Sequence, residues 1–266
     1  MTINPSCLII AGSDSGAGAG LQADLKTCSA HNVYASTVVT AITAQNTIGV
    51  NDVMNVPSKI IESQIRTLSK DLKVSIIKIG MLSDNKIIET VSFCLKKYFP
   101  EIPVILDPVM VAKGGFSLLN EDSIESLKKE LFPKSFLITP NLPEAEKILN
   151  TQIKNNKDMK ENIEMFRNIN VKNVLMKGGH LREEKIIDLL LNEEKVYKFI
   201  SDKIITENTH GTGCTLASAI ACNLLKGLSL YASVDNARKY VISCIINPYI
   251  IGHGHNPLNH FYNLFN

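Results

Sequence analysis

Short apolar runs alternate with longer amphipathic stretches along most of the chain. The short runs, rich in valine and isoleucine, predict buried strands, and stretches with apolar residues every three or four positions predict helices. The expected strands cover residues 6–12, 34–44, 74–79, 104–106, 136–139 and 173–176. The expected helices start near residue 21, cover 57–72, 85–98, 123–132 and 159–169, start again at 214, and cover 230–249. Strands that alternate with helices pair in parallel and are covered on both faces, so we expect an α/β fold with a largely parallel sheet.

The pattern changes late in the chain. Residues 186–191 and 196–200, separated by a polar turn, predict a β-hairpin at the edge of the sheet. The lysine-rich segment 150–160 predicts a surface loop that is too short to link two domains. Because neither an internal repeat nor a shift in composition divides the sequence, we expect one domain that covers residues 1–266.

Composition narrows the class of protein. The 266 residues are 45% hydrophobic with a formal net charge of +2, so the chain can bury a large core. The basic residues form no block typical of nucleic-acid binding, no uncharged run is long enough to span a bilayer, and the first residues do not resemble a secretory signal. The six cysteines lack metal-ligand spacing, which favours reduced thiols. We therefore expect a cytoplasmic protein that binds neither nucleic acid nor membranes.

Polar side chains follow several of the expected strands directly. Gln45 follows the second strand, Asp107 the fourth, Asn141 and Glu144 the fifth, and Lys177 the sixth. Ligands of open α/β sheets collect at the carboxyl ends of the strands, where these side chains would meet. Oxygen ligands suit Mg²⁺, and a lysine suits phosphate. Each residue also has a purely structural interpretation, as part of a turn or as a helix cap.

A glycine-rich segment precedes the most apolar helix. Gly211, Thr212 and Gly213 lead into a helix that opens at Cys214, an arrangement that can direct backbone N–H groups at an anion. The helix N-terminus is expected to lower the pKa of the Cys214 thiol. Taken alone, the segment could equally be an ordinary turn, with the cysteine as a small buried hydrophobe.

A second glycine-rich loop follows the first strand. Gly18-x-Gly20-x-x-Ala23 nearly matches a dinucleotide fingerprint, but its glycines lie several residues beyond the strand, and the next strand ends without an acidic residue. We therefore reject a dinucleotide-binding interpretation. Residues 112–115, Ala-Lys-Gly-Gly, predict a basic loop that can close over an anionic substrate. The histidines at 253, 255 and 260 lack the partners of a metal site and predict a structured C-terminal loop.

Seven motifs in a fixed order carry a resemblance to a known family. They are 11–26, Thr43-Ala-Gln-Asn-Thr47, Lys78-Ile-Gly-Met81, 107–115, Thr139-Pro-Asn-Leu-Pro-Glu144, Lys177-Gly-Gly-His180 and Asn208-Thr-His-Gly-Thr-Gly-Cys214. Together they resemble the ribokinase-type superfamily of small-molecule kinases, and within it the hydroxymethylpyrimidine/phosphomethylpyrimidine kinases of thiamine biosynthesis. One departure is Ala17, which stands where we expect a glycine; if its φ is positive, it costs on the order of 1 kcal/mol.

The resemblance implies a ribokinase-like three-layer αβα sandwich that transfers the γ-phosphoryl group of ATP, with Mg²⁺, to hydroxymethylpyrimidine and then to its monophosphate. It implies a homodimer and leaves open whether a monovalent cation is needed. The residues that it implies for the pyrimidine pocket are Gly12, Asp24, Gln45, Met81 and Val109. Those that it implies for the nucleotide are Asn141, Glu144, Lys177 and Thr212, with Asp107 and Glu144 on the metal.

The resemblance also assigns the catalytic centre. Gly211, Thr212 and Gly213 are implied as the anion hole, Lys177 as a phosphate ligand, and Cys214 as the base where sugar kinases carry an aspartate. Two alternatives stay open. A pyridoxal kinase would share the fold, the donor and the cysteine, and a catalytically silent relative would bind a pyrimidine without turnover.

Overall fold

One nine-stranded sheet runs through the protein, with strand order β3-β2-β1-β4-β5-β6-β7-β8-β9. The computed structural model describes residues 4–111, 119, 121–181 and 183–263. The strands are β1 (Ser6–Asp14), β2 (Ala35–Gln45), β3 (Val50–Asn55), β4 (Val74–Ile79), β5 (Val104–Leu106), β6 (Leu137–Ile138), β7 (Val174–Met176), β8 (Lys185–Leu191) and β9 (Val196–Asp202). From β2 to β7 the neighbouring strands pair in parallel, whereas β3, β8 and β9 pair antiparallel. The predicted fold class and edge hairpin are confirmed.

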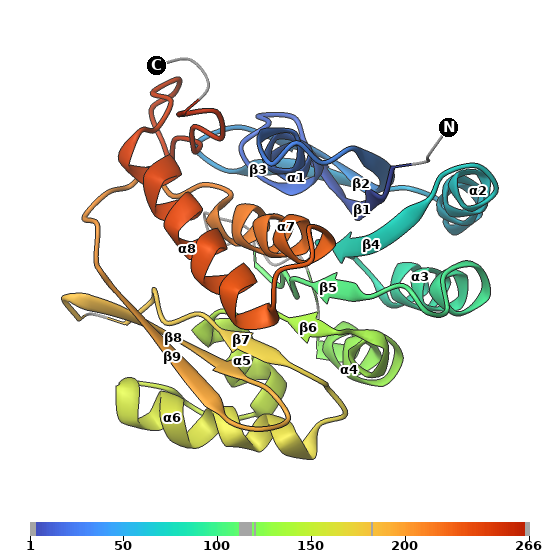
Figure 1. Cartoon of the computed structure of the whole chain (residues 1–266). Coiled ribbons are helices and arrows are strands. Elements are labelled where there is room, and N and C mark those ends of the chain that lie inside the picture. Colours follow the sequence, from blue (N-terminus) through green and yellow to red (C-terminus); the bar gives the residue numbers. More distant parts are fainter. Residues whose placement is uncertain (1–3, 112–118, 120, 182, 264–266) are drawn as a thin grey trace.

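Helices cover both faces of this sheet (Figure 1). The α-helices are α1 (Gly20–Ala30), α2 (Ser58–Ser69), α3 (Asn85–Tyr98), α4 (Glu121–Glu130), α5 (Leu142–Leu149), α6 (Asn156–Met165), α7 (Thr212–Leu225) and α8 (Leu230–Ile246). Short 3₁₀ turns, η1 (Phe132–Lys134) and η2 (Phe166–Asn168), follow α4 and α6. α1, α7 and α8 lie on one face, and α2 to α6 lie on the other. The result is the three-layer αβα sandwich that the family resemblance implies.

Successive side chains of β1 point to opposite faces of the sheet, so this one strand contributes to two hydrophobic cores. Cys7 and Ile9 pack with α1 and α7, whereas Leu8 and Ile10 pack with α2 and α3 on the opposite face. All four side chains are fully buried, because successive residues of a strand point to opposite faces and both faces are covered by helices. The centre of the sheet is therefore rigidly held, and functional groups gather where its strands end.

The prediction missed one strand and misplaced the start of one helix, each for a local reason. β3 was not predicted, since it is an edge strand whose side chains are half-buried or exposed and whose sequence, Val-Asn-Asp-Val-Met-Asn, is largely polar. The second half of the predicted loop 150–160 belongs to α6. That helix starts at Asn156 because the side chain of Asn155 accepts hydrogen bonds from the N–H groups of Lys157 and Asp158.

Ala17 adopts a φ of 57°, which lies in the left-handed region that favours glycine. This is the condition under which we expect the alanine to be strained. Its N–H donates to the carbonyl of Asp14 in the tight turn between β1 and α1. The basic loop that we predict at residues 112–115 lies outside the described residues. Within the described residues, none of the helices combines the length and the apolar character needed to cross a bilayer.

Candidate active site

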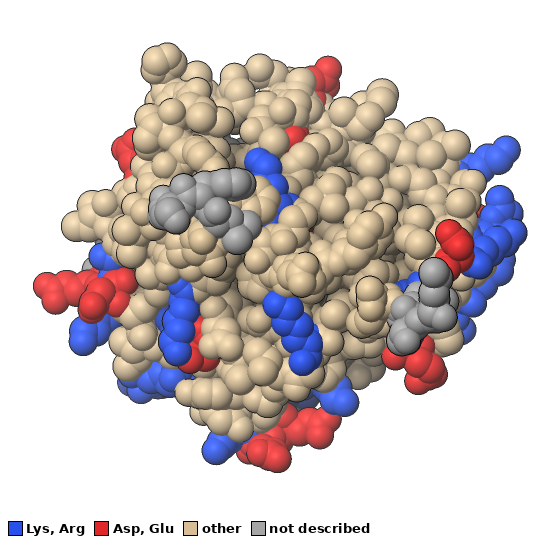
Figure 2. Space-filling model, turned by 45° about the horizontal axis from the view of Figure 1, so that its top comes forward, with Lys and Arg blue, Asp and Glu red and all other residues tan. Residues whose placement is uncertain are grey.

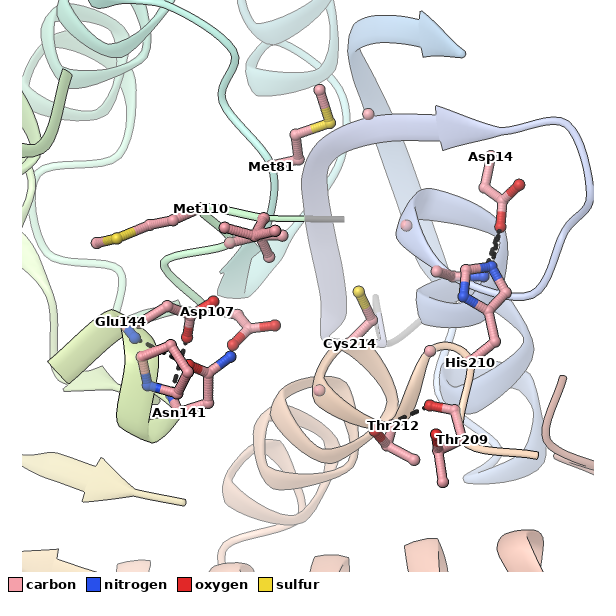
Figure 3. A pocket seen from close by; sticks show the side chains of 18 of the residues that line it. Asp14, Met81, Asp107, Met110, Asn141, Glu144, Thr209, His210, Thr212 and Cys214 are labelled. Carbon is pink, nitrogen blue, oxygen red and sulfur yellow. Dashed lines mark hydrogen bonds and ion pairs between the residues drawn. The ribbon is translucent and has the colours of Figure 1, made fainter. Parts of the chain in front are cut away.

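A cavity of about 340 Å³ opens at the carboxyl ends of the parallel strands, within the range of small-molecule sites. Its walls come from the C-terminal ends of β1 and β2 and the segments that follow β1, β4, β5, β6 and β7, together with the N-terminus of α7 (Figure 3). Nearly all of the predicted site residues line it, namely Gly12, Gln45, Met81, Asp107, Val109, Asn141, Glu144, Lys177, Gly211, Thr212, Gly213 and Cys214. Asp24 is the exception.

The N-terminus of α7 forms the floor of this cavity. Gly211 precedes the helix with a φ of 84°, a conformation that favours glycine. The Thr212 hydroxyl donates to the carbonyl of Thr209 (3.1 Å), which closes the turn ahead of the helix. First-turn N–H groups have no acceptor within their own helix, so this end of α7 offers donors and a positive dipole to an anion in the cavity.

The turn before α7 packs directly against the glycine loop that follows β1. A Cβ atom at Gly211 would collide with the carbonyl oxygen of Gly18, and a Cβ at Gly18 would collide with the ring of His210. Both positions therefore require glycine for close approach. This contact joins two segments that lie almost 200 residues apart in sequence and makes them one continuous wall.

A lysine–carboxylate group stands on the opposite wall. Lys177 Nζ lies 2.9 Å from Asp107 Oδ1, and the Thr139 hydroxyl donates to the same oxygen (3.0 Å). Burial raises the pKa of Asp107, but the positive charges of Lys177 and Lys78 outweigh burial and hold it below its ordinary value. A Cβ at Gly213 would lie 3.3 Å from both Asp107 Oδ2 and Lys177 Nζ, so the glycine turn and the charged pair are adjacent.

Glu144 serves as a helix cap and also faces the cavity. It forms a capping box with Asn141, in which each side chain accepts the other's backbone N–H (2.8 and 2.9 Å). Burial raises the pKa of Glu144 to about 7; Lys177 lowers it and the neighbouring Asp107 raises it. The structural and the functional interpretations of Glu144 are therefore compatible in the same geometry.

These carboxylates fit one mode of Mg²⁺ binding. Across the described part of the chain, no group of three or more His, Cys, Asp or Glu residues could hold a metal by itself. Mg²⁺ commonly binds through one or two carboxylates, water and the phosphates of its substrate. Asp107 and Glu144, next to a lysine and a helix N-terminus, match that donor set.

Cys214 lies between the two walls and projects into the cavity (Figure 3). Burial raises the pKa of its thiol to about 12, and the charges of Asp24 and Asp107 act in the same direction. Lys78 and the N–H of Gly20 lower it without offsetting burial. The expectation of a lowered pKa at this helix N-terminus is therefore wrong for the free protein, which holds a neutral thiol at neutral pH.

Asp24 does not reach the cavity, contrary to the expectation that it lines the pyrimidine pocket. It is fully buried, with Oδ2 2.7 Å from Lys78 Nζ and Oδ1 accepting from the Ser218 hydroxyl (2.7 Å). Burial raises the pKa of Asp24 to about 6 against the effect of Lys78. Asp24 thus belongs to an ion pair that lies beneath the site.

Sequence reasoning missed three polar groups at or below this site. Asp14 and His210 line the cavity and contact each other, and Lys78 is completely buried in β4. Asp14 ends its strand, as the assigned polar residues do, and so carried the same signal. A lysine within the apolar run of β4 signalled a buried charge that needs a partner. For His210, nothing in the sequence indicated a role at the site other than its position in the motif Asn208–Cys214.

Two of the three C-terminal histidines, His255 and His260, make hydrogen-bond contacts that hold the C-terminal segment against the rest of the protein. His260 Nε2 lies 3.0 Å from the Thr215 hydroxyl of α7, and His255 Nδ1 lies 2.9 Å from the carbonyl of Glu207. His210 forms an isolated parallel bridge with Pro257. These contacts support the predicted structured loop and brace the turn that precedes α7.

Comparison with known proteins identifies relatives over nearly the whole chain. A family model described as phosphomethylpyrimidine kinase matches residues 14–259. The hydroxymethylpyrimidine/phosphomethylpyrimidine kinase of Bacillus subtilis is 41% identical over 256 residues, which cover 96% of this chain and 94% of that protein. The thiamine biosynthesis bifunctional protein ThiED of Geobacter sulfurreducens is 42% identical over 96% of this chain, which spans about half (52%) of that protein.

Solved structures show the same fold. The pyridoxal kinase of Bacillus subtilis, in its ADP complex, superposes with a TM-score of 0.90 at 32% identity and full coverage of both chains. The phosphomethylpyrimidine kinase of Clostridium difficile 630 superposes with a TM-score of 0.79 at 41% identity, covering 91% of this chain and 99% of that one. With a family model that spans most of its length and relatives at about 40% identity, this chain belongs to the phosphomethylpyrimidine kinase family.

Proposed function

We propose that this protein transfers the γ-phosphoryl group of ATP to hydroxymethylpyrimidine, and then phosphorylates the monophosphate to the diphosphate. One observation carries the proposal: a single cavity holds an anion-binding helix N-terminus, a lysine–carboxylate group and a heterocycle-sized wall around Cys214. Phosphoryl transfer requires positioning and neutralisation of charge more than covalent chemistry, and these groups supply both. The family to which the chain belongs supports the choice of substrate.

The donor phosphates are assigned to the charged side of the cavity. Lys177, Asn141 and Thr212 would hold them there, and the related pyridoxal kinase that binds ADP supports a nucleotide in this fold. Asp107 and Glu144 would hold Mg²⁺, which supplies neutralisation of phosphate charge when bound. The N–H groups at Gly211–Gly213 stabilise the negative charge of the phosphoryl group in transit.

The acceptor is assigned to the opposite wall. Gly12, Gln45, Met81 and Val109 line that side, and the sulfur of Met81 lies close enough to Gly12 that a Cβ there would come within 3.0 Å. The apolar side chains offer a surface for a flat ring, and the Gln45 amide offers polar recognition at its edge. The hydroxymethyl group would then face Cys214.

Pyridoxal kinase activity is the second candidate. It is favoured by the TM-score of 0.90 and complete mutual coverage with the Bacillus subtilis pyridoxal kinase. The identity of 32% to that enzyme, against 41% to the pyrimidine kinase of the same organism, places the pyrimidine first.

We further propose that two copies of the chain associate. The C-terminal segment contacts the β2–β3 turn, where the N–H of His255 donates to the carbonyl of Thr47 (2.8 Å). Large apolar side chains are exposed in these two regions: Ile42, Ile48, Met54, Ile246, Tyr249, Ile250 and Ile251. In the view of Figure 2, charged side chains gather along the left, lower and right margins and are sparse toward the top. Exposed apolar surface of this kind marks protein interfaces.

Sedimentation velocity tests this association. It should show one species at twice the chain mass of 29.3 kDa, and a monomer at micromolar concentration would contradict the proposal.

The proposed activity is tested by ADP release from Mg-ATP with hydroxymethylpyrimidine, its monophosphate or pyridoxal as the acceptor. We expect turnover on both pyrimidines at rates well above the rate without acceptor. Turnover on pyridoxal alone would replace the proposal with its second candidate. Tight binding of the pyrimidine without ADP release would identify a catalytically silent relative.

Cys214→Ala should slow the first phosphorylation roughly a hundredfold and the second only a few-fold. The first acceptor is an alcohol that must lose a proton, whereas the second is a phosphate monoester that is already largely ionised at neutral pH. Equal losses in both steps would show that Cys214 only positions the substrate.

The pH dependence of the first step gives an independent check on Cys214. With the pKa of Cys214 raised to about 12, its thiolate fraction grows about tenfold per pH unit between pH 7 and pH 9. The wild-type kcat/KM for hydroxymethylpyrimidine should therefore rise with pH relative to that for the monophosphate. The rise should vanish in Cys214→Ala. A ratio that does not change with pH in the wild type would exclude proton transfer to this thiol.

A further inference from the structure

Asp14 collects donors from both loops that meet beside the cavity. Its Oδ1 accepts from the N–H of Gly16 (2.8 Å), and its Oδ2 accepts from the N–H groups of Gly18 (3.1 Å) and Ala19 (2.8 Å). His210 Nε2 lies 2.8 Å from the same Oδ2. Burial raises the pKa of Asp14, but the hydrogen bonds from His210 and the backbone outweigh burial and hold it below its ordinary value. Asp14 is therefore an ionised carboxylate.

This charge determines which atom of His210 carries a proton. An ionised carboxylate only accepts hydrogen bonds, so the imidazole Nε2 facing it must bear a hydrogen. Both side chains are buried, with exposed fractions of 7% for His210 and 3% for Asp14, so water does not compete for the contact. His210 therefore presents a fixed donor along this edge of the cavity.

The Gln45 amide lies between this donor and Thr43. In one of its two orientations the amide has Nε2 3.3 Å from His210 Nε2 and Oε1 3.2 Å from Thr43 Oγ1. That orientation sets two donors against each other, because His210 Nε2 has no lone pair left to accept. The Thr43 hydroxyl already donates its single hydrogen to the carbonyl of Ser13 (Oγ1 to O, 2.9 Å), and this orientation would require that hydrogen to serve a second acceptor.

Turning the amide by 180° removes both conflicts. The amide oxygen then shares the His210 Nε2–H with Asp14, and the amide NH₂ donates to the Thr43 hydroxyl oxygen. Amide orientation is decided by such proton counts, since oxygen and nitrogen are nearly alike in shape. The backbone of Gln45 is already pinned, because its N–H and carbonyl both bond the Ser15 hydroxyl (2.8 and 2.7 Å).

We infer that His210, held by Asp14, is a positioning residue that fixes the Gln45 amide with its oxygen toward His210 and its NH₂ toward Thr43. The orientation of an amide decides where it offers a donor and where an acceptor to the edge of a heterocycle. His210 thereby sets which acceptor heterocycles the site selects, without needing to touch them. The inference rests on the proposed function, because it takes Gln45 as a contact of the acceptor.

A double-mutant cycle tests whether His210 acts through Gln45. Gln45→Ala and His210→Leu should each raise the KM for hydroxymethylpyrimidine by roughly tenfold, with the KM for ATP unchanged within about twofold. The double variant should stay within about twofold of Gln45→Ala. His210→Gln, which keeps a donor, should recover most of the loss, and His253→Leu, an exposed histidine away from the cavity, is the matched control.

The outcomes separate this inference from the proposed function. A wild-type enzyme without turnover on pyrimidines would overturn both. Normal wild-type turnover with multiplicative effects of the two substitutions would overturn the role of His210 alone. A second measurement needs no variant: nitrogen chemical shifts of the His210 imidazole in ¹⁵N-labelled protein should show a protonated Nε2 between pH 6 and pH 9. An unprotonated Nε2 would overturn the inference even if His210→Leu failed to fold.

Discussion

The close approach of Gly18 and Gly211 is the constraint on which the site depends. No side chain fits between the loop after β1 and the turn before α7, so a helix N-terminus and a strand end become one wall. The Asp14–His210 contact lies across the same junction and adds a buried, charge-assisted hydrogen bond. The proposed donor site on α7 and the proposed acceptor site beside β1 and β2 would thereby be held at a fixed separation, as an in-line transfer between two bound molecules requires.

Buried charged side chains around the site influence the protonation state of Cys214. Lys78 and Asp24 form a fully buried ion pair beneath Cys214, and Lys177 and Asp107 form a second, largely buried ion pair beside it. Removing one partner of such a pair typically costs about 3–5 kcal/mol, because the remaining charge is left buried and uncompensated. Each lysine is balanced by a carboxylate, and burial therefore dominates at Cys214. A neutral thiol cannot accept a proton, so proton transfer to Cys214 would require its thiolate, whose fraction rises with pH.

Periodicity and strand-end chemistry predicted most of this architecture. Gln45, Asp107 and Lys177 converge because parallel strands end at one edge of the sheet, a geometric rule that needs no coordinates. The same rule could not predict the position of Asp24, because this residue lies on α1 and not at a strand end. Its carboxylate pairs with Lys78, which is 54 positions away in the sequence. The pKa of Cys214 could not be predicted either, because it sums burial and charges from several distant elements.

The central claim is that one cavity phosphorylates the same pyrimidine twice, and ³¹P NMR during turnover with Mg-ATP tests it most directly. Starting from hydroxymethylpyrimidine, the account predicts a monoester signal that rises and then gives way to the two signals of a diphosphate. A monoester that persists as the final product, or inorganic phosphate as the only new signal, would contradict it.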